Sequence, residues 1–139
     1  MATPHTVRAF PTRRFDSAEQ EAYLALWRTY DRLRAIEDEL FTRWDLTAQQ
    51  YNVLRLIRAD HPNPVPTLRL VGRLVSRAPD VTRMLDKLEA RGLITRTRST
   101  TDRRAVLVGI TESGVALLDE IADPLRDCHA RQLGHLTPD

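Results

Sequence analysis

The stretch Pro66–Thr111 reads PTLRLVGRLVSRAPDVTRMLDKLEARGLITRTRSTTDRRAVLVGIT and predicts two short helices, a turn between them, and a hairpin of two strands. Thr67 has the hydroxyl of a good N-cap, so the first helix is expected to begin there. Apolar side chains at helical spacing give this helix its expected buried face. These side chains are Leu68, Val71, Leu74 and Val75.

The second helix is expected to start at Pro79, because proline is tolerated in a first turn where its missing N–H would be unpaired anyway. Gly92 at the usual C′ position ends it. Its expected buried side chains are Val81, Met84, Leu85 and Leu88, and the strands of the hairpin are expected at Thr95–Thr97 and Ala105–Ile110. Helix, turn, helix and hairpin is the order of a winged helix-turn-helix, which indicates a DNA-binding element.

The distribution of charge supports this interpretation more than the composition does. The chain of 139 residues has a net charge of only +2. Residues 67–104 contain ten basic and four acidic side chains, a net of +6, whereas residues 1–66 are neutral and residues 105–139 carry −4. A solvated charged face is the simpler explanation of a charge cluster, but this cluster coincides with the predicted motif.

The second helix should offer its polar face to base edges in the major groove. Arg83 can bind guanine with both ends of its guanidinium, and Thr82 can contact a thymine methyl or a phosphate. Asp80 either accepts from cytosine N4 or complements the positive end of the helix. Arg77 and Lys87 are expected to contact phosphates, and Asp86 also lies on this face.

The turn of the hairpin is rich in arginine, and a flexible basic tip can enter a narrow minor groove. Its candidate DNA-binding residues are Arg96, Arg98, Arg103 and Arg104. Asp102 is unusual on a surface that meets phosphates. We expect it to pair with Arg104 and to shape the turn, leaving Arg103 free to reach DNA. The alternative for these arginines is a role in surface solubility only.

The N-terminal part of the chain is divided into an extended arm, residues 1–16, and a long helix, residues 17–44. The arm either reaches DNA through basic side chains such as Arg14, packs against a partner subunit through side chains such as Phe15, or is frayed. Ser17 and Gln20 fit a capping box. The apolar stripe of the helix contains Tyr23, Leu26, Trp27, Tyr30, Leu33, Ile36, Leu40, Phe41 and Trp44.

A helix of this size is about 42 Å long, more than a small core covers, so part of the stripe is expected to meet a second subunit. Four of the aromatic side chains are also candidates for the wall of an effector pocket, although core packing is the simpler explanation for most of them. These side chains are Trp27, Tyr30, Trp44 and Tyr51.

Two further helices are expected around the motif. Thr47, as N-cap with Gln50 in a capping box, starts a helix that buries Tyr51, Leu54 and Ile57. Thr111 caps a last helix over residues 111–135, in which Pro124 removes one hydrogen bond and predicts a kink or break.

Residues Leu46–Gly114 resemble the MarR family of bacterial transcriptional regulators. The resemblance rests on VTRMLDKLEARGLITR at Val81–Arg96 and DRRAVLVGITESG at Asp102–Gly114, with SRAPD at Ser76–Asp80 as a recurrent variant. The second segment fits the family pattern Asp-x-Arg-x-x-x-Val-x-[Leu/Ile]-Thr-x-x-Gly.

The resemblance implies a mainly α fold: a winged helix-turn-helix at 46–110, long N- and C-terminal dimerisation helices at 17–44 and 111–135, and a two-to-three-stranded β wing. It implies a homodimer that binds a pseudo-palindromic operator, usually as a repressor, with Asp102 and Arg104 as the acid–arginine pair of the wing and Arg103 at its tip. Members often respond to small aromatic compounds. MarR-like proteins ordinarily continue into another helix beyond Leu136–Asp139, so the dimer is expected to rest on residues 1–44 and on the helix after Thr111.

Other function classes find little support. The sequence contains no nucleophile elbow, phosphate loop, zinc-helix motif or glycine-rich nucleotide fingerprint, so we predict neither an enzyme nor a cofactor. A metal site at Cys128, His129 and His135 is not predicted, because the first two point about 100° apart on a helix. The single cysteine and the lack of a long apolar run fit a cytoplasmic protein. The alternatives are a winged-helix protein-interaction module and a redox or ligand sensor acting through Cys128.

Overall fold

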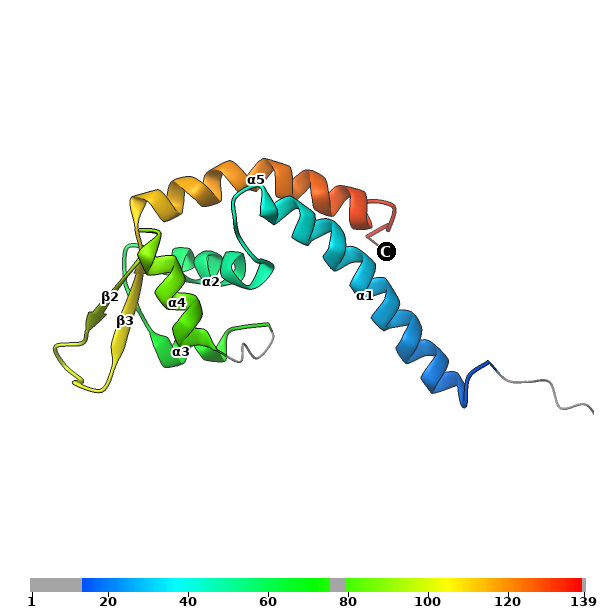
Figure 1. The fold of residues 1–139 in the computed structure, drawn as a ribbon, viewed down its shortest axis with the longest axis horizontal. Helices are drawn as coiled ribbons and strands as arrows, with labels where there is room; N and C mark the ends of the chain where they lie inside the picture. The colour runs from blue at the N-terminus through cyan, green and yellow to red at the C-terminus, as the bar shows by residue number, and fades with distance from the viewer. Residues whose placement is uncertain (1–13, 76–79, 139) are drawn as a thin grey trace, which may run out of the picture. The chain divides into compact units, whose positions relative to one another are not determined.

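The computed structural model describes residues 14–75 and 80–138. These residues form two compact units, the first ending at Arg34 and the second beginning at Ala35. The first unit contains the start of the long helix α1 (Ala18–Thr42), and the second contains the rest of α1 and every other element. Figure 1 gives the order of these elements along the chain.

The first unit begins with a hydrogen-bonded turn that caps α1. The Ser17 hydroxyl accepts a hydrogen bond from the Gln20 amide at 3.0 Å, as predicted. The side-chain carbonyl of Gln20 accepts from the Asp16 amide at 2.7 Å instead of from Ser17, so the predicted capping box is displaced by one residue. Tyr23 and Trp27 pack edge to face on this part of the helix, with ring centroids 6.2 Å apart.

The second unit contains three short helices, a small sheet whose first strand lies between the first two of these helices in the chain, and a long last helix. Helix α2 starts at the capping box of Thr47 and Gln50, which is confirmed with both reciprocal hydrogen bonds present. The elements after α1 are α2 (Ala48–Ala59), β1 (Val65–Pro66), α3 (Thr67–Gly72), α4 (Val81–Ala90), β2 (Ile94–Arg98), β3 (Val106–Ile110) and α5 (Glu112–Leu133).

The sheet has three antiparallel strands in the order β1-β3-β2. The hairpin pairs Ile94 with Ile110 at its base and Arg98 with Val106 at its outer end. Strand β1 comes from the proline-rich segment and pairs Val65 with Val108. Proline is compatible with this position because β1 lies at an edge of the sheet. The predicted winged helix-turn-helix with a two-to-three-stranded wing is thus confirmed.

The core of the second unit fills the space between the helices and one face of the sheet. Phe41 is fully buried and stacks on Tyr51 with ring centroids 4.8 Å apart. Leu54 of α2, Leu88 of α4 and Ile121 of α5 are also fully buried. Leu70 of α3 belongs to the same cluster, so side chains of all five helices contribute to a single hydrophobic core.

Helix α3 begins at Thr67, as predicted, but the predicted N-cap role of Thr67 and the predicted buried face are wrong. The N-cap is Pro66, and the Thr67 hydroxyl instead donates a hydrogen bond to the Val106 carbonyl of β3 at 3.0 Å. Leu70 is fully buried, whereas Leu68 and Val75 are each 87% exposed. The helix has only six residues, so packing against its neighbours sets the buried face and the apolar spacing of the sequence does not.

Helix α5 starts at Thr111, whose hydroxyl accepts from the Gly114 amide at 3.1 Å, as predicted. The helix continues through Pro124, so the break considered for this position does not occur. Buried Ile121 and Leu125 on either side of the proline anchor both halves to the core, and this packing offsets the lost hydrogen bond. None of the helices over the described residues is long and apolar enough to cross a membrane.

Candidate nucleic-acid interface

Helix α4 separates its apolar and polar side chains onto opposite faces. Leu85 and Leu88 are buried, and Val81 and Met84 pack partly buried against the same core. This confirms the predicted inward face. The exposed face carries side chains that can donate hydrogen bonds to bases or phosphates, namely Thr82, Arg83 and Lys87.

The first turn of α4 is capped by an acid. The Asp80 carboxylate accepts a hydrogen bond from the Arg83 amide at 2.9 Å. Of the two roles considered for Asp80, this geometry favours stabilisation of the helix N-terminus over a contact with cytosine. Pro79, the expected start of the helix, and Arg77, a candidate phosphate contact, lie outside the described residues.

The far end of α4 is closed by Arg91 and Gly92. Arg91 is the C-cap, and Gly92 has a φ of +70°, the left-handed conformation that favours glycine. The Arg91 guanidinium donates to the main-chain carbonyls of Trp44 and Asp45, in the turn between α1 and α2. The local sequence around Arg91 does not predict this contact, because its partners lie 46 and 47 residues earlier in the chain.

The tip of the wing is held by contacts with main-chain amides. The Ser99 amide donates to the Ala105 carbonyl at 2.9 Å, which extends the hairpin by one step. The Asp102 carboxylate accepts from the Arg104 amide at 3.0 Å. Asp102 therefore shapes the turn and contacts Arg104, as expected, but the contact is with the main chain of Arg104.

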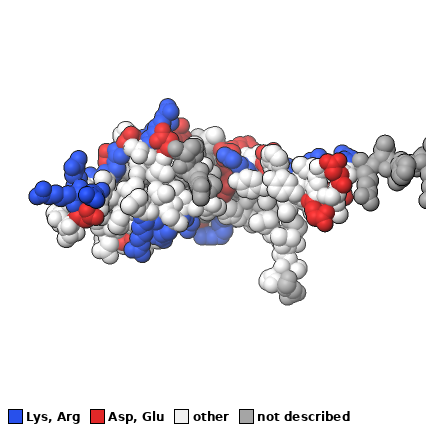
Figure 2. Space-filling model, turned by 90° about the horizontal axis from the view of Figure 1, so that it is seen from below, with Lys and Arg blue, Asp and Glu red and all other residues white. Residues whose placement is uncertain are grey.

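Three wing arginines, Arg98, Arg103 and Arg104, are exposed at this tip. Figure 2 shows basic side chains gathered at the end of the second unit that the hairpin forms, with few carboxylates among them. Such a concentration of positive charge attracts the phosphate backbone of DNA without regard to sequence. The wing and the exposed face of α4 thus offer the two kinds of contact expected for a winged helix.

Arg96 differs from the other wing arginines. Its side chain is only 23% exposed and lies against two carboxylates of α4. Nη2 donates to Asp86 Oδ1 at 2.6 Å and to Glu89 Oε1 at 3.0 Å, and Nε donates to Glu89 Oε2 at 3.2 Å. The hydrogen bonds from Arg96 lower the pKa of Glu89, and both carboxylates raise the pKa of Arg96. Its guanidinium is therefore already engaged within the protein.

A groove of about 320 Å³ runs beside the exposed face of α4. It is lined by Arg83 and Lys87 of α4 together with Thr47 and Gln50 at the start of α2. The sequence pattern predicts only a helix-capping role for Thr47 and Gln50. Their position next to two candidate DNA contacts places the start of α2 at the edge of the same surface.

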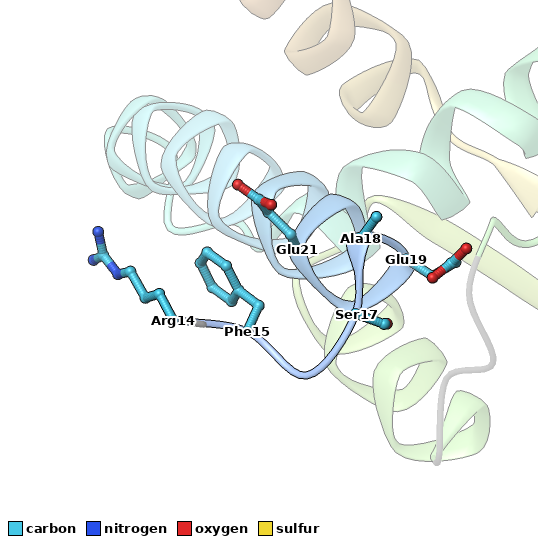
Figure 3. Close-up of a pocket in the computed structure, with 6 residues that line it drawn as sticks. All are labelled: Arg14, Phe15, Ser17, Ala18, Glu19 and Glu21. Atoms are coloured by element: carbon cyan, nitrogen blue, oxygen red, sulfur yellow. The ribbon is translucent and has the colours of Figure 1, made fainter. Parts of the chain in front are cut away.

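A separate cavity of about 660 Å³ lies in the first unit, at the start of α1. Arg14 and Phe15 lie together on one side of the turn into the helix, with the guanidinium carbon 5.8 Å from the ring centroid. Figure 3 shows Glu19 directed away from them on the other side. Glu21, the other acid of the lining, lies on the same side as Phe15 (Figure 3).

The four aromatic residues proposed for an effector pocket have different surroundings. Trp27 and Tyr30 belong to the first unit and are 59% and 61% exposed. In the second unit, Trp44 Nε1 donates to Glu120 Oε2 at 3.3 Å. Tyr51 stacks on Phe41, and burial raises the pKa of the Tyr51 hydroxyl. The pocket they were expected to line stays a prediction.

Cys128 lies in the core and has no exposed surface. Burial raises the pKa of its thiol, which disfavours the reactive thiolate. The neighbouring His129 Nδ1 is 2.9 Å from Gln132 Oε1. Over residues 14–75 and 80–138, no group of three or more histidine, cysteine or acidic side chains is arranged to hold a metal ion.

These features define a winged-helix DNA-binding protein. Residues 46–106 match the model of the MarR family. The chain is 31% identical over 122 residues to the HTH-type transcriptional repressor NicR of Pseudomonas putida, and the match covers 88% of this chain and 75% of NicR. The chain therefore belongs to the MarR family of transcriptional regulators.

Solved structures agree with this assignment. The crystal structure of a MarR transcription factor from Planctomyces limnophilus is 54% identical with a TM-score of 0.76, and the match covers 88% of each chain. The BpsR protein of Bordetella bronchiseptica, whose DNA binding is regulated by 6-hydroxynicotinic acid, is 28% identical with a TM-score of 0.74, over 85% of this chain and 88% of BpsR.

The match to the HTH-type transcriptional regulator PecS of Dickeya dadantii is 28% identical over 87 residues and covers 62% of this chain. The chain thus spans about half (52%) of the length of PecS.

Proposed function

We propose that the chain acts as a homodimeric repressor that binds a pseudo-palindromic DNA operator in the bacterial cytoplasm. The observation that carries the proposal is the polarity of α4, which buries Leu85 and Leu88 and exposes Arg83 and Lys87 next to an arginine-rich wing. A repressor role is supported by the likeness to NicR, which is itself a transcriptional repressor.

The roles of the individual side chains follow from their positions. Arg83 reads a guanine in the major groove and Thr82 contacts a thymine methyl or a phosphate, while Lys87 neutralises a phosphate. Arg103, at the tip of the wing, enters the flanking minor groove, with Arg98 and Arg104 on the phosphates beside it. Arg77 is expected to add a further phosphate contact.

Dimerisation is supported by the exposed apolar side chains in the first unit. Tyr23, Leu26, Trp27 and Tyr30 are each between 59% and 71% exposed on one helix. A contiguous apolar surface of this kind is typical of a protein–protein interface. In the dimer, the two recognition helices would lie about 34 Å apart, one turn of the DNA helix.

The proposal extends to release from DNA by a small aromatic effector. Its support is the likeness to BpsR, whose DNA binding responds to 6-hydroxynicotinic acid. The side chains proposed to contact the effector are Trp27, Tyr30, Trp44 and Tyr51. An effector can act only through unequal affinity for the DNA-binding and non-binding conformations of the dimer.

The decisive experiment is selection of bound sequences from random duplexes with the full chain, followed by a mobility shift in the presence of competitor DNA. We expect a site with two-fold symmetry and an affinity that falls steeply with salt. Selection that enriches no sequence would contradict the proposal and would favour a winged helix that serves as a protein-interaction module. The buried thiol of Cys128 gives no support to a redox sensor.

A further inference from the structure

We infer that Arg96 is a positioning residue that fixes the wing relative to the recognition helix α4, and that it does not contact a DNA phosphate. The inference rests on the proposed binding of operator DNA and names a residue on which the fit to that DNA depends. The proposed role of Arg96 therefore differs from that of the other wing arginines, although all of them carry the same charge.

The geometry of Arg96 joins two elements that should enter different grooves of DNA. Arg96 lies on β2, the first strand of the wing, and its guanidinium bonds Asp86 and Glu89 on α4. The two acids are three residues apart, so they lie on the same side of the helix and face the strand together. The three hydrogen bonds measure between 2.6 and 3.2 Å.

The position of Arg96 along β2 explains why the contact matters. Ile94, two residues earlier on the same face of the strand, is buried in the core. Strand pairing ends at Arg98, and the loop 99–105 extends beyond it. Arg96 thus bonds α4 at a point between the apolar base of the wing and its tip. These bonds restrain the hairpin from rotating about its base.

Charge also argues against a phosphate contact. Two carboxylates surround one guanidinium, so this cluster carries a local net charge of −1. A phosphate that approached Arg96 would have to displace Asp86 or Glu89 and to face the repulsion of the carboxylate left unpaired. The exposed side chains of Arg98, Arg103 and Arg104 can reach phosphates without this cost.

The test compares Arg96→Met with Arg98→Met in the full chain bound to its selected operator. Removal of a phosphate contact lowers the slope of log affinity against log salt by about one. We expect this change for Arg98→Met. For Arg96→Met we expect an affinity loss of about tenfold with an unchanged slope. In the complex with Arg96→Met, the protection of the operator DNA from hydroxyl radicals should weaken at the flanking minor grooves and persist at the central major grooves.

A conservative variant adds a second readout. Arg96→Lys keeps the charge but loses the fork that bonds two carboxylates, so we expect it to behave like Arg96→Met. Restoration of wild-type affinity and flanking protection by lysine would overturn the inference. The inference would also be overturned if Arg96→Met lowered the slope of log affinity against log salt by about one relative to the wild type, or left the flanking footprint unchanged.

Glu89→Gln keeps the inference testable if the Arg96 variants fail to fold. This change removes one negative charge from α4 and leaves the positive charge of Arg96 in place, so a purely electrostatic account predicts tighter binding. Positioning by Arg96 predicts weaker binding and weaker flanking protection, and tighter binding by Glu89→Gln would therefore contradict it. Failure of the wild-type chain to bind any duplex would refute the proposed function, whereas wild-type binding with unaffected variants would refute only the role of Arg96.

Discussion

The guanidinium of Arg91 donates a hydrogen bond of 2.7 Å to the main-chain carbonyl of Asp45. A second bond, of 2.9 Å, reaches the carbonyl of Trp44. Asp45 has a φ of +51°, and the left-handed turn at this residue lets the chain leave α1 and enter α2. Arg91 therefore ties the end of the recognition helix to the turn that ends α1.

Replacement of Arg91 by alanine should leave two carbonyls without their charged donor. Because Arg91 is exposed, water replaces part of the loss, and we expect the free energy of unfolding to fall by about 1–2 kcal/mol. Urea denaturation followed by circular dichroism measures the change. Arg126→Ala is the matched control, since the Arg126–Asp123 pair is exposed and its loss should cost little. Equal stability of the two variants would contradict a role for Arg91 in joining these elements.

Gly114 permits α5 to start against the base of the wing. A Cβ at this position would lie 2.4 Å from the Leu93 carbonyl oxygen and 2.7 Å from Ile110 Cγ1. We expect Gly114→Ala to lower the free energy of unfolding by about 1–3 kcal/mol, because main-chain atoms would have to move. Gly72→Ala, where a Cβ would meet nothing within 4 Å, should be neutral or stabilising by thermal unfolding. A Gly114→Ala chain with an unchanged Tm would refute this close approach.

The two proposed classes of DNA contact should respond differently to mutation. Arg83→Ala should relax base preference at one operator position and cost about 1–3 kcal/mol of binding free energy, because it removes a base contact. Arg103→Ala should weaken binding to all duplexes and reduce the salt slope by about one. Quantitative mobility shifts on the operator and on its single-base variants measure both. Identical selectivity profiles for the wild type and Arg83→Ala would rule out base reading by Arg83.

The buried thiol of Cys128 should be unreactive in the native protein. Burial raises its pKa, so at any pH below that value the thiolate fraction is smaller than for a free cysteine. We expect a colorimetric thiol reagent to label Cys128 slowly at pH 7 and fast only after unfolding in urea. Cys128→Ser should bind DNA like the wild type under both reducing and oxidising conditions. Rapid labelling of the folded protein, or a redox-dependent loss of binding, would revive the sensor hypothesis.

Local rules predicted those parts of the fold that local interactions determine. Thr47 and Thr111 cap their helices as expected, because a hydroxyl and an amide three residues later suffice for the bond. The inward face of α4 was equally readable, since ten residues present nearly three turns of apolar spacing. Helix α3 has only six residues, and there the apolar spacing predicts a buried Leu68, whereas the structure exposes Leu68 and buries Leu70.

The surface was harder to predict than the fold because charge alone does not reveal a side chain's partner. Arg96 and Arg98 are both basic residues of the wing, yet the first is bonded to α4 and the second is exposed. The acids that bind Arg96 lie seven and ten residues earlier in the chain, and they meet it only once the hairpin folds onto the helix. Arg91 was overlooked for the same reason, since its partners precede it by 46 and 47 residues.

The last strand pair of the wing, Arg98 with Val106, marks where a rigid ladder gives way to the loop 99–105. The length of this loop therefore limits how far Arg103 can extend beyond that pair. If the proposed DNA binding holds, an operator must place a minor groove within this reach and also offer the bases read by α4. Sites with the correct bases but an ill-placed minor groove would then be rejected, so the wing would act as a geometric filter on the sequences that α4 accepts.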